Sequence, residues 1–295
     1  MARPRLAIAI PSLNRAHMLD ALLREFQPTC DALSIPILVS DNGSSDDTGA
    51  VCSRWAERWS GLRYRRHPET IPMGRSVMSA IEMSDAEYTW LAGDDDYLQP
   101  DGIRAVADLL SRRSPSAVVV RSIEVPTANF VALDRPLAPQ LVEILARHPR
   151  EGEIREHRDA GEFFAAHHII LPAPTVIYAT DRARATDYER YQETHHAHIG
   201  ALFDALAAEQ AERGCIDVPE LLDVCSVSLT VHHDRGKDHW GGLHRYFAEQ
   251  GFPKWFALLP PIYAPHLPVA EAHYRHIFRE ILQPTATAAS GEATK

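Results

Sequence analysis

Residues 88–97 read YTWLAGDDDY, an apolar run that ends in three consecutive carboxylates. The run 88–92 has the composition of a buried β-strand. Three adjacent like charges are costly to hold together unless a cation neutralises them, and a hard divalent cation with oxygen ligands does so. A solvated acidic turn ahead of a helix near Pro100 is the alternative interpretation. The position directly after a strand favours a binding site.

The sequence on either side extends this strand into an α/β pattern. Strand-like runs alternate with helical patterns, which is typical of a parallel sheet covered by helices. The predicted strands are 6–10, 35–40, 62–66, 88–92 and 117–125, with later ones at 169–178 and 222–231. The predicted helices of the first part are 17–26, 47–59, 74–83 and 101–112. Residues 126–283 are expected to continue the same fold, with a helix near 269–282 that carries Val269 in its apolar stripe. The small, polar residues 284–295 are expected to form a disordered tail.

Two more predicted strands end in polar clusters, IPSLNR at residues 10–15 and VSDNGSSDD at residues 39–47. Asp41 can accept a hydrogen bond from a nucleobase N–H, Gly43 permits a tight turn, and Arg15 could face a phosphate. Each cluster alone is also the pattern of an ordinary turn with a helix cap. Because ligands bind beyond the carboxyl ends of strands in open α/β sheets, three such clusters in chain order favour one ligand site.

Composition excludes several classes of protein. The net charge of -10 and pI near 5.9 argue against nucleic-acid binding, which needs a basic surface. No apolar run approaches the ~20 residues of a transmembrane helix, and the N-terminal apolar stretch is too short for a signal peptide. We therefore expect a cytoplasmic protein without a transmembrane segment. The four cysteines form no CxxC pair, so they indicate neither a disulfide framework nor a cysteine zinc site.

Together these blocks resemble glycosyltransferase family 2. The matching pieces are IAIPSLNR, VSDNGSSDDT and the block from IPMGR to LQPDGI, which lie within residues 5–113. The segments YQETHHAHIGALFDAL and VHHDRGKDHW resemble the abequosyltransferase-like branch of the family. The resemblance implies a GT-A fold, with an α/β, Rossmann-like nucleotide-sugar-binding sheet in residues 1–125 and a mostly helical acceptor-side region in residues 126–283.

The resemblance also implies a donor site for a nucleoside diphosphate sugar, with UDP foremost and dTDP or GDP as alternatives. Asp41 would receive the base, Asp94 would lie near the ribose, and Asp95 would bind the Mg²⁺ or Mn²⁺ ion that bridges the phosphates, with Asp96 in support. The other nucleotide-contacting residues that it implies are Pro11, Ser12, Arg15, Asn42, Gly74 and Arg75. The family's frequent Asp-x-Asp-Asp appears here as Gly-Asp-Asp-Asp, so the share of each carboxylate stays open.

Two features of the second half could complete this site. Related GT-A folds often place a histidine late in the chain on the metal, and either His232 or His233 could take that position. Strand alternation would point only one of the two at the ion. Arg235, in a basic loop hinged by glycine, could fold over the diphosphate as a lid does.

The chemistry implied by the family is a single inverting displacement, in which a base removes a proton from the acceptor hydroxyl. The base should come from the acceptor half. Glu193 is the first candidate because it lies just before a predicted helix, where relatives place their acidic base. His198 and Asp187 are the alternatives.

The acceptor is expected to be a small molecule or a glycan, and the helix near 269–282 would pack on the body or on a second subunit of a homodimer. A sugar nucleotidyltransferase is an alternative, although such enzymes open with a Gly-rich loop and residues 11–15 contain no glycine. A metal-dependent hydrolase is the second alternative. It would need an HxH or HExxH motif at the first strand, and the sequence has none there. A non-catalytic nucleotide-sugar-binding protein is the third alternative.

Overall fold

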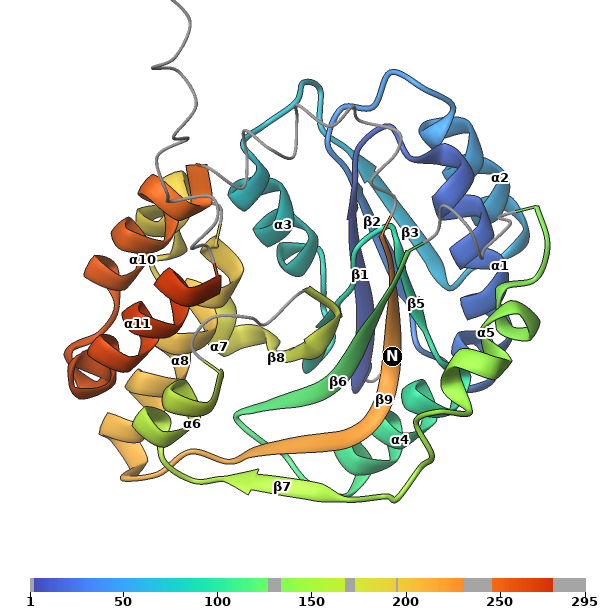
Figure 1. The fold of residues 1–295 in the computed structure, drawn as a ribbon. Coiled ribbons are helices and arrows are strands. Elements are labelled where there is room, and N and C mark those ends of the chain that lie inside the picture. The colour runs from blue at the N-terminus through green and yellow to red at the C-terminus, as the bar shows by residue number, and fades with distance from the viewer. Residues whose placement is uncertain (1–2, 127–133, 168–172, 195, 231–245, 278–295) are drawn as a thin grey trace, which may run out of the picture.

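A computed structural model describes residues 3–126, 134–167, 173–194, 196–230 and 246–277 (Figure 1). Its strands are β1 (Leu6–Ser12), β2 (Ile37–Asp41), β3 (Leu62–Arg66), β4 (Tyr88–Leu91), β5 (Asp96–Leu98), β6 (Ala117–Pro126), β7 (Ile154–His157), β8 (Val176–Ala179) and β9 (Val218–Thr230). Its α-helices are α1 (Ala16–Ala32), α2 (Thr48–Arg58), α3 (Met73–Glu82), α4 (Pro100–Arg112), α5 (Leu137–Leu145), α6 (Ala160–His167), α7 (Thr180–Arg184), α8 (Ala197–Arg213), α10 (Phe252–Leu258) and α11 (Leu267–Ile277). Shorter helical turns are η2 (Ala173–Thr175), η3 (Tyr188–Thr194), η4 (Phe247–Gly251) and η5 (Pro261–His266).

The described strands form one sheet in the order β3-β2-β1-β4-β8-β6-β9-β5, with β7 paired to β9. Strands β1 to β4 pair in parallel, as the alternating pattern predicts. The sheet is mixed beyond them, because β8 enters between β4 and β6 and runs antiparallel to both. β5 and β7, which the sequence did not predict, also run antiparallel to β9.

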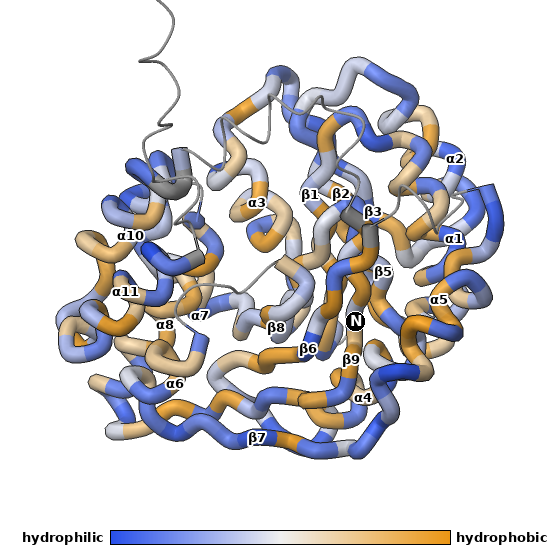
Figure 2. The backbone as a smooth tube through the Cα atoms, viewed as in Figure 1, coloured by the Kyte–Doolittle hydropathy of each residue, from blue (hydrophilic) through white to orange (hydrophobic). Residues whose placement is uncertain are grey.

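Helices pack their apolar sides against both faces of this sheet. Alternate residues of β1 point to opposite faces, so that Leu6, Ile8 and Ile10 join one buried cluster while Ala7 and Ala9 join the other. The first cluster includes side chains of α1, α2, α4 and α5, and the second includes side chains of α3, α6, α8, α10 and α11. Figure 2 shows the apolar residues gathered on the central strands and the hydrophilic ones on the outer turns. Coverage on both faces explains why β1 as far as Ile10 and β2 as far as Val39 are continuous apolar runs.

The C-terminal helix departs from its predicted orientation. A helix is present at α11, but the prediction that Val269 belongs to its apolar stripe is wrong, since Val269 is 64% exposed. Ala270 and Tyr274, four residues apart on one face, are buried against the body instead. No helix of the described residues is both long and apolar enough to span a bilayer.

The loop after β2 is held tightly under the segment that follows β3. The Asn42 amide donates to the Ile71 carbonyl at 3.0 Å, and the Ile71 N–H donates back to Asn42 Oδ1 at 2.9 Å. Gly43 has a φ of +79°, and a Cβ there would lie 2.8 Å from the Glu69 carbonyl carbon. Glycine is required at this position both for its backbone conformation and for the close approach.

We expect Gly43→Ala to destabilise the fold by about 2 kcal/mol or more, because left-handed strain and a backbone clash add. Gly214→Ala is the matched control: its φ is +75°, but a Cβ at that position would meet nothing within 4 Å. Strain alone should cost Gly214→Ala about 1 kcal/mol. Urea unfolding of both variants gives the two values. Equal losses would mean that the contact with Glu69 contributes nothing.

Candidate active site

The carboxyl ends of β1, β2 and β4 meet at one edge of the sheet. Ser12 is in register with Asp41, and the Asn42 N–H donates to the Ser12 carbonyl at 2.8 Å. The Ser12 hydroxyl donates to Asp94 Oδ2 at 2.7 Å. The three polar clusters predicted from the sequence therefore lie side by side, because parallel strands end at the same edge.

Asp41 is fully buried at the end of β2 and is held by hydrogen bonds. The Ser44 N–H donates to Oδ1 at 2.8 Å and the Tyr64 hydroxyl donates to Oδ2 at 2.6 Å. Arg66 places its Nε 3.8 Å from Oδ2. Burial and the hydrogen bond to Asp41 raise the pKa of Tyr64, so this phenol stays a donor. Sequence reasoning missed Tyr64 and Arg66, although alternation along β3 puts both on one face.

Asp94 and Asp96 are carboxylates whose charge is disfavoured by their surroundings. Burial and the charge of Asp95 raise the pKa of Asp94 to about 6 and that of Asp96 to about 7. The Gly93 N–H donates to Asp96 Oδ2 at 2.6 Å, and a Cβ on Gly93 would lie 2.8 Å from carboxylate oxygens of both Asp95 and Asp96. Hydrogen bonding by Ser228 on β9 also lowers the pKa of Asp96, but it does not offset the burial.

The carboxylates at 94–96 fit a divalent cation whose coordination shell is completed by a bound ligand. Carboxylate oxygens are what Mg²⁺ and Mn²⁺ prefer, and a bound cation would relieve the repulsion within 94–96. In the described part of the chain, one oxygen from each of the three aspartates cannot be chosen so that all three lie within 4.8 Å of one another. The aspartates therefore do not enclose an ion by themselves. Mg²⁺ is usually held by one or two carboxylates together with substrate phosphates, so an open carboxylate site is the expected form. His232, His233 and Arg235 lie outside the described residues.

Arg15 brings a buried positive charge to the same edge. Its side chain is only 5% exposed, and its Nη1 is buried without a hydrogen-bond partner among the described residues. The charge of Arg15 lowers the pKa of Asp94, so the two groups interact electrostatically. A buried guanidinium nitrogen without a partner suits an anionic ligand such as a phosphate. Pro11, earlier in the chain, is half-buried within β1.

Asn14 organises the two loops that border this edge, and sequence reasoning did not single it out. Its φ is 55°, and its Oδ1 accepts from the Ser45 N–H at 2.7 Å. The Asn14 N–H in turn donates to the Ser44 hydroxyl at 2.9 Å. Asparagine tolerates the left-handed region better than most residues, which is the signal that could have identified it.

The structure gives Gly74 and Arg75 contacts with the second half of the chain. A Cβ on Gly74 would lie 3.2 Å from the Ala197 Cβ, so glycine allows α3 to approach α8. Arg75 forms an ion pair with Glu189 on η3. Asn42, as described above, is engaged with the Ile71 backbone. The side chains of Asn42 and Arg75 thus contact protein, and Gly74 serves the close packing of α3 on α8.

The acceptor-side candidates Glu193 and His198 sit in different environments. Glu193, near the end of η3, has a side chain that is 82% exposed and lies 3.1 Å from Lys254 Nζ. His198, in the first turn of α8, has a buried Nδ1 without a hydrogen-bond partner in the described chain. Burial lowers the pKa of His198 to about 4, so its imidazole is neutral at physiological pH. The two residues flank the contact between α8 and the start of α3.

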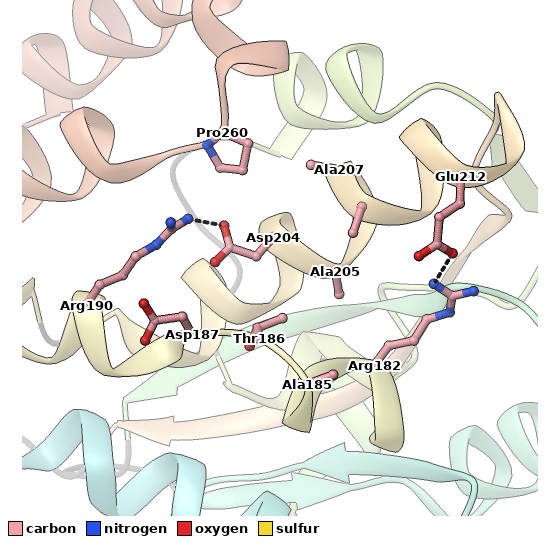
Figure 3. A pocket seen from close by; sticks show the side chains of 11 residues that line it. Arg182, Ala185, Thr186, Asp187, Arg190, Asp204, Ala205, Ala207, Glu212 and Pro260 are labelled. Atoms are coloured by element: carbon pink, nitrogen blue, oxygen red, sulfur yellow. Dashed lines mark hydrogen bonds and ion pairs between the residues drawn. The ribbon is translucent and has the colours of Figure 1, made fainter.

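Asp187 lies near the amino-terminal end of β4, whereas the carboxylates at 94–96 follow its carboxyl end. It follows α7, and α7 follows β8, whose last residue Ala179 pairs with Tyr88 at the start of β4. Asp187 lines a cavity of about 500 Å³ together with Arg190 and Asp204 (Figure 3). The structure thus separates Asp187 from the carboxylates at 94–96.

Residues 7–167, more than half of the chain, match the family model described as Glycosyl transferase family 2. The chain belongs to glycosyltransferase family 2. The abequosyltransferase RfbV of Salmonella typhimurium is 26% identical over 111 residues, which are 37% of this chain and 33% of that protein. A PGL/p-HBAD biosynthesis glycosyltransferase of Mycobacterium tuberculosis is 29% identical over 136 residues, 44% of this chain and 51% of that protein. These matches confirm the family resemblance, and they span between a third and a half of the relatives' length.

Solved structures share the fold over nearly the whole chain. S. aureus TarS in complex with UDP-GlcNAc has a TM-score of 0.59 at 13% identity, covering 95% of this chain and 76% of that chain. The mannosyltransferase PcManGT from Pyrobaculum calidifontis, in complex with GDP-Man and Mn²⁺, has a TM-score of 0.57 at 18% identity, covering 96% and 73%. The GT-A α/β fold expected for this family 2 chain is confirmed.

The raised pKa of Asp94 predicts a pH-dependent gain in stability for Asp94→Asn. The unfolded chain loses this proton near pH 3.8, whereas the folded chain holds it to about pH 6. Ionised Asp94 therefore destabilises the native state progressively above pH 3.8, and fully above about pH 6. In EDTA, we expect Asp94→Asn to raise Tm by a few degrees at pH 8 and to change it little at pH 4.

The matched control is Asp108→Asn, which removes an exposed carboxylate that pairs with Arg112 on the surface of α4. It should change Tm little at either pH, because surface ion pairs contribute little. A gain for Asp94→Asn that is the same at pH 4 and pH 8 would contradict the electrostatic cause.

Proposed function

We propose that this family 2 protein transfers a sugar from a nucleoside diphosphate sugar to an acceptor hydroxyl, with inversion and with the help of a divalent cation. The observation that carries the proposal is the group of adjacent carboxylates at 94–96, of which Asp96 is buried, held beside the buried Asp41 and Arg15 at one edge of the sheet. Such an edge offers Asp41 as a hydrogen-bond acceptor for a nucleobase, the positive charge of Arg15 for a phosphate, and carboxylates for a metal ion.

Each donor contact follows from the chemistry of the group. Asp41 accepts from a base N–H, which suits uracil, thymine or guanine, so UDP is our first choice with dTDP and GDP behind it. Arg15 faces the diphosphate, and Asp95 with Asp94 or Asp96 holds Mg²⁺ or Mn²⁺. A cation bound there would offset the negative charge that develops on the departing diphosphate. The complexes of TarS with UDP-GlcNAc and of PcManGT with GDP-Man and Mn²⁺ support this choice of ligands.

The acceptor hydroxyl is activated from the second half of the chain. Residues 1–125 supply the donor site in this proposal, and η3 with α8 supplies the base. Glu193 is solvent-exposed and lies 3.1 Å from Lys254 Nζ, so its carboxylate is open to an acceptor that approaches from solvent. His198 is the alternative, since a neutral imidazole can also accept one, although its lowered pKa makes it a weak base.

Nucleotide binding tests the donor site directly. We expect UDP to bind strongly with Mn²⁺ and weakly in EDTA, because an acidic site needs the cation to accept a diphosphate. Asp95→Asn should remove the effect of Mn²⁺. Asp41→Asn should keep the dependence of UDP binding on Mn²⁺ but lower the affinity for UDP about tenfold or more. This is the loss expected for a charge-assisted hydrogen bond. Calorimetry of UDP, dTDP and GDP measures these affinities, and equal binding in EDTA and Mn²⁺ would rule out the metal role.

The base is tested by the rate of transfer. Glu193→Gln should lower turnover about 100-fold or more without changing donor affinity, since a general base acts after the donor has bound. Glu212→Gln, another exposed glutamate but at the opposite edge of the sheet, is the matched control and should keep parental turnover. If Glu193→Gln transfers sugar at the parental rate while His198→Gln is inactive, the histidine is the base.

A further inference from the structure

Two histidines and a glutamate from three separate elements converge at a distance from the sheet edge that carries Asp41 and the carboxylates at 94–96. His157 ends β7, His167 ends α6 and Glu220 lies near the start of β9. One ligand atom from each lies within 4.8 Å of the other two, and no other group of at least three such residues in the described chain does so. The side chains are 9%, 14% and 13% exposed, so the cluster is shielded from solvent.

The distances match the coordination shell of a small transition-metal ion. His157 Nε2 lies 3.0 Å and His167 Nε2 lies 3.4 Å from the same Glu220 oxygen, Oε2. Ligands about 2.0–2.1 Å from a tetrahedral zinc ion lie roughly 3.3 Å from one another. Imidazole nitrogen and carboxylate oxygen are both zinc ligands, and both histidines present Nε2.

Hydrogen bonding alone leaves this cluster incomplete. His167 Nε2 is buried, and its distance of 3.4 Å from Glu220 Oε2 is longer than an ordinary N–H···O hydrogen bond. An apolar ring fills the adjoining space, with the Phe163 centroid 4.8 Å from that of His167 and 5.2 Å from that of His157. A buried ring nitrogen directed at a carboxylate is the arrangement that a shared cation would satisfy.

Arg155 opposes a cation here, because its Nη1 lies 3.2 Å from Glu220 Oε2. Its side chain is 58% exposed, so the guanidinium can turn into solvent when an ion takes its place at the carboxylate. The cluster is also distinct from the donor site. Glu220 lies eight residues before Ser228 on β9, up to roughly 26 Å along an extended strand.

We propose that His157, His167 and Glu220 bind a Zn²⁺ ion that ties β7, α6 and β9 together. A water molecule occupies the fourth position, since the cluster supplies three ligands. The ion replaces three long-range side-chain contacts by coordination bonds at the base of β9, the strand whose other end places Ser228 beside Asp96. This site does not depend on the proposed sugar transfer.

The test is zinc content and Co²⁺ spectroscopy of tag-free protein. We expect the full chain, grown with zinc and desalted, to retain about one Zn²⁺, and the Co²⁺-substituted protein to show the intense visible bands of tetrahedral coordination. Asp95→Asn should retain this ion, which separates it from a donor-site metal. Glu220→Gln and His167→Gln should lose it, whereas His266→Gln, a neighbour of α6 outside the cluster, should keep it.

Thermal unfolding gives a second readout on the wild type alone, should a variant fail to fold. Added Zn²⁺ should raise the Tm of the metal-stripped wild type and of Asp95→Asn by several degrees, because an ion that binds only the folded state stabilises it. Wild-type protein that holds no Zn²⁺ and gives no tetrahedral Co²⁺ spectrum would overturn the proposal. Zinc retained equally by folded Glu220→Gln would also overturn it, and so would zinc that is lost from Asp95→Asn.

Discussion

Negative charge buried at the carboxyl edge of the sheet is the constraint on which the rest of the site depends. Asp41 has no exposed surface, and burial raises the pKa of both Asp94 and Asp96 above its usual range. Asp41 and Asp96 cannot turn freely into water, because they are buried on strands that pack against apolar side chains, whereas Asp94 lies on the partly exposed turn before β5. The fold therefore holds carboxylates where they destabilise it, which is common where a site is organised for a charged ligand. Tyr64 and Arg15 supply the donors and the positive charge that make this arrangement tolerable.

The second half of the chain is built onto this edge as part of the same sheet. β8 and β9 extend the sheet beyond β4, and the end of β9 pairs with Asp96 on β5. Gly74 lets the start of α3 lie against Gln192 of η3 and Ala197 of α8, so both elements approach the edge that carries Asp41 and the carboxylates at 94–96. The position of Glu193 and His198 therefore follows from the packing of α3 on α8. Exposure distinguishes the two residues: one carboxylate faces solvent and one imidazole is kept neutral by burial.

The sequence predicted the parts of this site that depend on local pattern. Apolar runs followed by polar clusters placed Ser12, Asp41 and the carboxylates at 94–96 at one edge, since parallel strands share the edge at which they end. Contacts between distant segments were beyond that reasoning. The reversed entry of β8, the hydrogen bond from Tyr64 to Asp41, and the meeting of His157, His167 and Glu220 all depend on tertiary pairing that no local spacing encodes. The stripe assigned to Val269 failed for a related reason, because which face of a short helix is buried is set by its neighbours.

The central claim is that the carboxylates at 94–96 hold a divalent cation against the diphosphate of a donor bound over Asp41. A crystal structure with Mn²⁺ and UDP, using the anomalous signal of manganese, tests it most directly. We predict a manganese peak within coordination distance of Asp95 and of both phosphates, with the uracil against Asp41. A manganese peak only at the cluster of His157, His167 and Glu220, or UDP bound at another edge of the sheet, would contradict the account.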